Sequence, residues 1–369
     1  MPDLYIGLMS GTSLDGVDGV LANFSGPRMV VTHHASAGFA PALRAELLAL
    51  NASGDNELHR AALAGNALSR VYAQVVHELL QRSGHPAHAI DAIGAHGQTV
   101  RHRPQEFDGT GYTLQLGNPA LLAEQTGITV VADLRSRDVA AGGQGAPLVP
   151  AFHQGVFGRP HETVLVLNIG GISNLSVLRA DGSVIGFDCG PGNALMDYWC
   201  QRHTGHAFDQ SGAWAAKGQV LPDLLAALMQ EPFLKKAPPK STGRDLFNPA
   251  WLLAHLVHFA QAAPVDVQAT LTQFTASACS ECAISYQKGS KILAVCGGGA
   301  LNAHLMGCLQ INCPDLQVVP TDDLGLPALQ VEAAAFAWLA RQALHRAPGN
   351  LASVTGAAGA RVLGAVYPA

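Results

Sequence analysis

Two stretches of the chain share one turn pattern, about half a chain apart. Residues 4–22 read LYIGLM, SGTSLDG and VDGVLA in succession, and residues 163–178 read TVLVL, NIGGISN and LSVL. Each stretch predicts an apolar strand, a turn rich in glycine and small polar side chains, and a second strand. Glycine lets backbone N–H groups close on an anion, and Ser, Thr and Asn add donors without bulk. Two such turns can hold both ends of a polyphosphate, so the sequence indicates an enzyme that uses a nucleotide.

Length and composition predict a globular protein with two domains. The chain has 369 residues, more than the ~250–300 at which a single hydrophobic core stops growing. It is 48% hydrophobic and 13% charged, which is typical of a compact fold and not of a disordered chain. Its net charge of -5 argues against a nucleic-acid-binding protein, which normally carries a basic face. A nucleotide therefore has to be held by local donors and a divalent cation.

The sequence predicts a cytoplasmic protein without a membrane segment. No stretch reaches the ~18 uninterrupted apolar residues of a membrane span, and Asp3, Ser10 and Asp15 interrupt the N-terminal apolar stretch, so we expect no signal peptide. The seven cysteines are an odd number and lie only in the second half, which argues against a disulfide framework. Cys279 and Cys282 have zinc-like spacing without a second pair, and we interpret them as buried helical cysteines.

Polar residues follow three short predicted strands in the first half. The strands at 89–95, 112–116 and 128–132 end at HGQT (96–99), GNP (117–119) and Asp133. Ligands bind beyond the carboxyl ends of strands in an α/β sheet, so these endings are candidate site residues. The Gly- and Pro-rich stretch 142–150 predicts the crossing between domains. We expect a first domain of residues 1–150 plus 345–369 and a second of residues 151–344.

Three glycine-rich turns, at 10–18, 168–174 and 297–299, are candidate phosphate or nucleotide contacts. In the turn at 10–18, backbone amides are expected to cradle phosphate while Asp15 or Asp18 helps to hold the hydration shell of Mg²⁺; the alternative is an ordinary hairpin turn. The run Gly297 to Gly299 follows a strand and precedes a helix, which fits close approach to a nucleotide, although a loose loop has the same composition. The chain contains neither G-x-G-x-x-G nor G-x-x-x-x-G-K-[ST], which disfavours Rossmann and P-loop folds.

Asp188 is the candidate general base, because it follows the predicted strand 183–187 and precedes a helix-opening GPGN sequence. A carboxylate at that place is suited to accept a proton from a nucleophile, and the alternative is a helix N-cap or turn residue. His96 with Gln98 is a candidate pair for sugar hydroxyls. Arg137, with Arg135 and Asp138 beside it, is a candidate for a substrate carboxylate or a surface ion pair. Glu332 is either a helix-dipole partner or a pocket residue.

Taken together, these motifs resemble the anhydro-N-acetylmuramic acid kinase family. The resemblance extends from residue 4 to the C-terminus, and its blocks are MSGTSLDGVD (9–18), HGQT (96–99), QLGNP (115–119), RDVAAGGQGAPL (137–148), NIGGISN (168–174) and FDCGPGN (187–193). Leu134 and Ile172 stand where relatives often have Phe, and the functional blocks show no departure.

The resemblance implies a fold, a reaction and an assembly. The fold is that shared by actin, hexokinase and the heat-shock chaperone ATPases, with two α/β domains of mixed sheets and flanking helices and the active site in the cleft between them. The reaction converts 1,6-anhydro-N-acetylmuramic acid, ATP and water into N-acetylmuramic acid 6-phosphate and ADP, in peptidoglycan recycling. Members of the family look like homodimers, so the resemblance implies a homodimer here.

The resemblance also implies residue roles. Because O6 of the anhydro sugar is tied to C1 and carries no proton, Asp188 is expected to activate a water that attacks C1. The residues expected to bind ATP are Gly11, Thr12, Ser13, Leu14, Asp15, Gly16, Val17, Asp18, Asn168, Gly170, Gly171, Asn174, Gly297, Gly298 and Gly299. The metal is Mg²⁺, held by Asp15 through water. The residues expected to bind the sugar and its lactyl carboxylate are Ser10, His96, Asn118, Arg137 and Glu332.

Two other functions remain open from the sequence. One is a plain kinase for a free amino sugar, which would turn over N-acetylmuramic acid as well as its anhydro form. The other belongs to a different class: a sugar-sensing regulator or a chaperone-like ATP-driven binding module. Full-rate ATP hydrolysis without sugar would favour the chaperone-like function.

Overall fold

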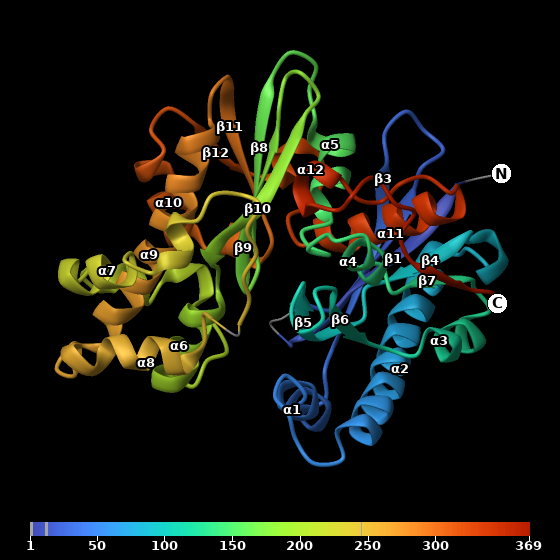
Figure 1. Ribbon diagram of the computed structural model, residues 1–369, viewed down its shortest axis with the longest axis horizontal. Helices are drawn as coiled ribbons and strands as arrows, with labels where there is room; N and C mark the ends of the chain where they lie inside the picture. The colour runs from blue at the N-terminus through green and yellow to red at the C-terminus, as the bar shows by residue number, and fades with distance from the viewer. Residues whose placement is uncertain (1–2, 12–13, 245) are drawn as a thin grey trace. The chain divides into compact units, whose positions relative to one another are not determined.

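The computed structural model describes residues 3–11, 14–244 and 246–369. The chain forms two compact units, Met1–Val156 with Gln330–Ala369, and Phe157–Leu329. Each unit has its own sheet and its own hydrophobic core (Figure 1).

The first unit is built on a six-stranded sheet in the order β13-β7-β4-β1-β2-β3. Strands β1, β2 and β3 pair antiparallel, whereas β4 and β7 continue the sheet parallel to β1. The predicted first hairpin is therefore formed by β1 and β2. The strand bounds are β1 Leu4–Met9, β2 Gly16–Asn23, β3 Val30–Gly38, β4 Ala92–Ala95, β7 Val130–Ala132 and β13 Ala365–Tyr367.

The side chains of β1 alternate between the two faces of this sheet, and both faces are covered. Leu4, Ile6 and Leu8 are buried in the cluster that contains the apolar face of helix α2 (Glu57–Ser83). Tyr5 points the other way and joins a separate cluster with helix α11 (Val331–Leu344). Successive side chains of a strand point to opposite faces, so the apolar run of β1 is covered by a helix on each side.

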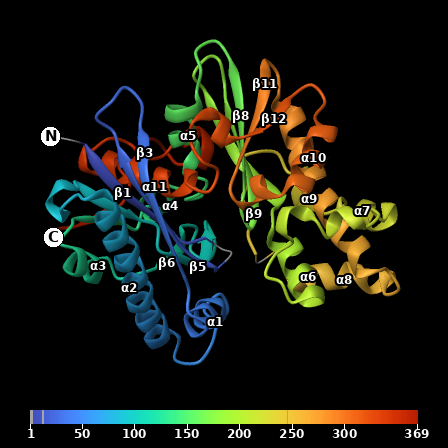
Figure 2. The same ribbon diagram turned by 180° about the vertical axis from the view of Figure 1, so that it is seen from behind.

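Helix α11 belongs to the first unit, which differs from the boundary expected from the sequence. The expected second domain ran to residue 344, but α11 packs on β1, β2 and β4 (Figure 1 and Figure 2). Its Ala-rich surface approaches two glycines of the sheet: a Cβ at Gly7 would overlap the backbone oxygen of Ala333, and one at Gly94 would overlap that of Phe336. Small residues on both sides allow this close packing.

The remaining elements of the first unit surround this sheet. Strands β5 and β6 pair with each other in a separate two-stranded ribbon, so the predicted strand at 112–116 does not lie in the main sheet. The bounds are α1 Pro41–Ala49, β5 Gln98–Pro104, β6 Gly111–Leu116, α3 Pro119–Thr126, α4 Ser136–Ala140, α5 Val149–Phe157 and α12 Ala352–Thr355.

The second unit repeats the same topology on a five-stranded sheet, in the order β10-β9-β8-β11-β12. Strands β8, β9 and β10 are antiparallel, and β11 and β12 continue parallel to β8. The bounds are β8 Thr163–Ile169, β9 Ile172–Leu178, β10 Val184–Pro191, β11 Ser290–Cys296 and β12 Gln317–Pro320, with helices α6 Ala194–Thr204, α7 Pro222–Leu228, α8 Pro249–Leu256, α9 Pro264–Tyr286 and α10 Ala303–Asn312.

Repetition of this strand order confirms the expected fold class, a two-unit α/β protein with the mixed sheets of the actin-like fold. The core of the second unit lies between its sheet and helices α6 to α10. Within the described residues, none of the helices has both the length and the apolar character needed to cross a bilayer.

Candidate functional site

The first glycine-rich turn is anchored by one apolar side chain. Leu14 has a left-handed backbone, with φ of 57°, and its side chain is buried beside Leu47, Leu50 and Val100. Its amide donates to the carbonyl of Gly11 at 3.3 Å. The buried side chain of Leu14 thus fixes the turn to this apolar cluster. Thr12 and Ser13, which are predicted to contact phosphate, lie outside the described residues.

The acidic residues of this stretch have different surroundings. Asp15 is exposed in the turn, a position suited to an outer-shell partner of a hydrated cation. Asp18 lies on β2, and its Oδ1 is 3.1 Å from Nε2 of His34 on β3. Between them, Gly16 is pressed against the backbone of Ala37, and Val17 is buried in the core. The two carboxylates thus differ in that Asp15 is exposed to solvent and Asp18 lies beside His34.

His96 is buried, and both of its ring nitrogens are engaged by the protein. Nδ1 is 3.1 Å from the backbone oxygen of Ser10, and Nε2 is 3.0 Å from a guanidinium nitrogen of Arg135. Because a carbonyl only accepts and a guanidinium only donates, Nδ1 carries the proton and Nε2 accepts. Burial, with a smaller effect of Arg135, lowers the pKa of His96 to about 3. The imidazole is neutral and ties the first turn to Arg135.

Asn118 and Gln98 also contact the protein backbone. The Oδ1 of Asn118 accepts from the amide of Leu121 as the N-cap of α3, and its Nδ2 donates to Asn66. The Nε2 of Gln98 donates to the carbonyl of Gly11 at 3.0 Å, while its buried Oε1 has no hydrogen-bond partner among the described residues. His96 and Asn118 line a cavity of about 160 Å³ at the ends of β4 and β7.

Arg137 and Asp138 are neighbours on α4 with opposite environments. Arg137 is exposed. Asp138 is fully buried and accepts from the amide of Gly145 at 2.7 Å, from Nδ2 of Asn350 at 2.6 Å and from Oγ1 of Thr355 at 2.7 Å. Asp138 therefore joins the glycine-rich loop after α4 to the C-terminal segment. The half-buried Glu332 lies in the first turn of α11.

The turn between β8 and β9 is braced by the start of α6. The amide of Gly192 donates to the carbonyl of Gly171 at 3.0 Å, and the amide of Asn193 donates to that of Gly170 at 2.8 Å. A Cβ at Gly192 would overlap the oxygen of Gly170. The FDCGPGN and NIGGISN motifs, separate in the sequence, therefore meet backbone to backbone.

The third glycine run, Gly297 to Gly299, packs against the end of β8 and the start of α6. Gly297 has φ of 78°, and a Cβ there would lie 2.5 Å from Oδ1 of Asn168. A Cβ at Gly299 would lie 2.5 Å from the Cβ of Ile169. Gly298 lies close to the side-chain amide of Asn193. The structure thus brings together all the predicted glycine motifs of the second unit, and a Cβ at Gly297 or Gly299 would overlap its neighbours.

A row of polar side chains crosses the sheet of the second unit beside this turn. Asp188 on β10 is the register partner of Asn174 on β9, which is also the partner of Asn168 on β8. Cys296 on β11 continues the row, and its thiol donates to Oδ1 of Asn168 at 3.7 Å. Their chain neighbours, such as Leu167 and Phe187, face the helix-covered core. Alternation therefore places the polar row on the opposite face.

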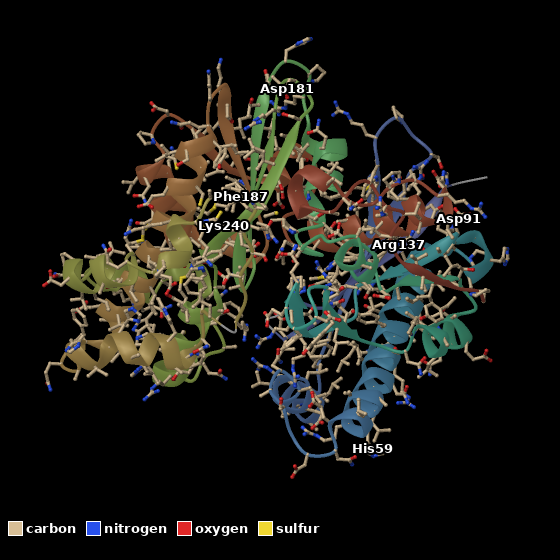
Figure 3. The ribbon with its side chains drawn as sticks, viewed as in Figure 1. His59, Asp91, Arg137, Asp181, Phe187 and Lys240 are labelled. Atoms are coloured by element: carbon tan, nitrogen blue, oxygen red, sulfur yellow. The ribbon has the colours of Figure 1, made fainter. Side chains whose placement is uncertain are left out.

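Asp188 is held by a loop that comes from much later in the chain. It is 8% exposed and lies where the register of β10 shifts before Gly190. Its amide donates to the carbonyl of Lys240 at 3.1 Å, and its Oδ2 accepts from the amide of Thr242 at 2.8 Å. The ammonium of Lys240 lies 5.8 Å from the centroid of the Phe187 ring (Figure 3). Residues 240–244 read KSTGR, a polar sequence in which no motif indicates this contact.

The described residues contain no group of three or more His, Cys, Asp or Glu side chains arranged to hold a metal ion. The described residues supply instead the backbone amides of glycine turns, which are hydrogen-bond donors, and one carboxylate, Asp188, held at a strand end as an acceptor. Duplicated mixed sheets with such anion-binding turns are typical of a class of nucleotide-binding proteins that includes kinases.

Comparison with known proteins places the chain within this class. The model of the family "Anhydro-N-acetylmuramic acid kinase" matches residues 3–369, and the chain belongs to that family. It is therefore an enzyme, a kinase. The resemblance noted in the sequence is confirmed.

Individual relatives align over essentially the whole chain. The anhydro-N-acetylmuramic acid kinase of Variovorax paradoxus is 66% identical over 372 residues, covering 100% of this chain and 99% of the relative. That of Albidiferax ferrireducens is 61% identical, covering 100% of both. Among solved structures, the activator of 2-hydroxyisocaproyl-CoA dehydratase from Clostridium difficile with bound ADPNP aligns with 90% of this chain and 92% of its own, at 13% identity and a TM-score of 0.47.

Proposed function

We propose that this kinase uses ATP and water to convert 1,6-anhydro-N-acetylmuramic acid into N-acetylmuramic acid 6-phosphate and ADP, and that it serves peptidoglycan recycling. Membership of the family supports the substrate. The observation that carries the mechanism is the fixed position of Asp188, whose Oδ2 accepts from the amide of Thr242.

The anhydro bridge explains why the reaction needs a base for water. O6 of the substrate is bonded to C1, so there is no hydroxyl proton for an ordinary kinase base to remove. In the proposed step, Asp188 takes a proton from water, the water oxygen bonds to C1, and the C1–O6 bond breaks. The electron pair left on O6 attacks the γ-phosphorus, and ADP leaves. A positioned base contributes about 10²–10⁴-fold to such a step.

Phosphate binding is assigned to the glycine turns of both units. The turn at 10–16 and the turn at 168–174 supply backbone donors to the phosphates of ATP, and Gly297 to Gly299 contact its adenosine part. Backbone amides held by buried contacts need no reorganisation as charge develops, which is the main protein contribution to phosphoryl transfer. Asp15 would hold Mg²⁺ through its hydration shell, and the ion would supply positive charge beside the phosphates.

The sugar contacts are assigned to the first unit. Arg137 is exposed on α4 and matches the lactyl carboxylate, while His96 and Asn118 line the cavity of about 160 Å³ at the strand ends. Glu332 completes the proposed set. We place the enzyme in the cytoplasm as a homodimer; light scattering of the purified protein tests the assembly.

A substrate comparison tests the proposed reaction. Purified enzyme is assayed with Mg-ATP and either the anhydro sugar, free N-acetylmuramic acid or no sugar, with ADP release as the readout. We expect ADP release with the anhydro sugar and not with free N-acetylmuramic acid or without sugar. Equal turnover of free N-acetylmuramic acid would show a plain sugar kinase and contradict the role of Asp188 in ring opening. Full-rate hydrolysis without sugar would indicate a chaperone-like ATPase.

A further inference from the structure

Three groups of the first unit form a closed ring of hydrogen bonds. The Oγ of Ser10 lies 2.9 Å from the hydroxyl of Tyr72 and 3.0 Å from the carbonyl oxygen of Gly97. The amide of Gly97 lies 3.1 Å from the same Tyr72 hydroxyl. Ser10 is 1% exposed and Tyr72 is 2% exposed, so water does not compete for these groups.

The direction of every bond in the ring follows from its two backbone groups. The carbonyl of Gly97 only accepts, so Ser10 donates its single hydroxyl proton to it. Tyr72 must then donate to the Oγ of Ser10. The amide of Gly97 only donates, so it closes the ring on the oxygen of Tyr72. Burial raises the pKa of Tyr72, which keeps its proton in place at neutral pH.

The ring joins two turns that the sequence assigns to different ligands. Ser10 starts the glycine-rich turn after β1, and Gly97 lies in the turn after β4. Two further bonds run between the same turns, from His96 to the carbonyl of Ser10 and from Gln98 to the carbonyl of Gly11. Tyr72 is the member that comes from a helix, α2, and it is packed in the main core of the unit. It therefore ties both turns to a rigid element.

We propose that Tyr72 is a positioning residue for phosphoryl transfer, which acts by fixing Ser10 and Gly97 so that the first turn presents its backbone donors to ATP in one geometry. The proposal rests on the assignment of this turn to ATP. It gives Ser10 a different role from the expected sugar contact, because the only proton of its hydroxyl is donated to Gly97.

Replacing Tyr72 by Phe removes the phenolic oxygen and leaves the aromatic side chain in the apolar core. The amide of Gly97 then has no acceptor, and the Oγ of Ser10 loses its donor. Buried groups left unpaired are costly, so the two turns loosen while the apolar packing of α2 remains. Catalysis suffers more than binding, because phosphate donors act in the transition state only when they are pre-positioned.

The test combines steady-state kinetics with amide hydrogen exchange on Tyr72→Phe, Ser10→Ala and the double variant. At saturating substrates and at a temperature where each variant is folded, we expect each single variant to lose about 10-fold in kcat, with the KM for ATP changed less than about threefold. The double variant should be no slower than the slower single variant, because both substitutions open the same ring. The matched control is Tyr5→Phe, which alters another buried tyrosine of the same unit, on strand β1, and should retain wild-type kcat.

Hydrogen exchange reports on the ring without turnover. The amide of Gly97 should exchange faster in Tyr72→Phe than in the wild type, and unchanged in Tyr5→Phe. Wild-type kcat in Tyr72→Phe, multiplicative losses in the double variant, or a loss confined to Ser10→Ala would overturn the proposal; the last would show that Ser10 contacts the ligand directly. Absence of wild-type turnover would contradict the proposed function, while the exchange measurement still decides whether the ring orders the turns.

Discussion

The backbone amide of Thr242 lies 2.8 Å from Oδ2 of Asp188 and donates a hydrogen bond to it. This contact spans 54 residues of sequence, and it sets the direction of the carboxylate at the bulge of β10. A second backbone bond, from the amide of Asp188 to the carbonyl of Lys240, holds the same loop against the strand. The orientation of the proposed base therefore depends on main-chain geometry.

Asp188→Asn should abolish most turnover while keeping the shape of the site. The amide cannot accept the proton of water, so we expect kcat to fall by about 10²–10⁴-fold, with ATP affinity nearly unchanged by calorimetry. Asp181→Asn is the matched control, because Asp181 is exposed in the β9–β10 turn (Figure 3); it should keep wild-type kcat. Retention of more than a tenth of the wild-type rate by Asp188→Asn would exclude this residue as the base.

Thr242→Pro tests the backbone bond to Asp188. Proline has no N–H, so the carboxylate loses its fixed donor, and a misplaced catalytic group can cost about 10²-fold in rate. Thr242→Ala keeps the amide and should lose far less in the same kinetic assay. If the two variants were equally slow while both remained folded, the threonine side chain and not its amide would be responsible.

His96 should make the stability of the first unit depend on pH. Its pKa is about 3 in the folded protein, against about 6.5 for an unfolded histidine. The unfolded state binds the proton more readily than the folded state. The contribution of neutral His96 to the free energy of unfolding is therefore fully present above pH 6.5 and is lost as pH falls towards 3. Between pH 6.5 and 5 this amounts to about 2 kcal/mol.

Urea unfolding at pH 7 and pH 5 measures this effect. The wild type should lose about 2 kcal/mol more free energy of unfolding than His96→Gln over this range. His59→Gln, at an exposed histidine on α2 (Figure 3), should lose as much as the wild type. A pH dependence in His96→Gln equal to that of the wild type would mean that His96 titrates normally.

Gly7→Ala should strongly destabilise the first unit. The new Cβ would overlap the backbone oxygen of Ala333 on α11, and overpacking of this kind costs about 3 kcal/mol. Gly155→Ala is the control: Gly155 lies within α5, and a Cβ added there would meet no atom within 4 Å, so alanine should stabilise the helix by about 0.5–1 kcal/mol. Thermal melting distinguishes the two. An unchanged melting temperature in Gly7→Ala would show that α11 does not pack tightly on β1.

The fold could be predicted largely because its repeat is local. Residues 4–22 and 163–178 each contain both strands and the turn of one hairpin, so period and turn chemistry are visible in a short window. The extent of the first unit could not be predicted in the same way. Helix α11 is separated from β1 by most of the chain, and its complementarity to Gly7 and Gly94 becomes visible only when the backbones are placed together.

In the candidate site, too, features that are local in the sequence could be predicted and contacts between distant residues could not. The turns at 168–174 and 297–299 could be identified from their glycines, and the structure brings them together. Supporting residues such as Tyr72 and Thr242 carry no motif, because one acts through a single hydroxyl and the other through its backbone. Asn118 is prominent in the sequence, yet its side chain caps α3. A polar residue in a motif therefore does not by itself show which backbone groups its side chain will hold.

Turnover in ¹⁸O-labelled water shows which atom receives the oxygen of water. If Asp188 directs water to C1 while O6 receives the phosphoryl group, the label must appear in the C1 hydroxyl of the sugar phosphate and not in its phosphate group. Mass spectrometry of the product and its fragments locates the label. Label in the transferred phosphate, or an unlabelled product, would contradict the account.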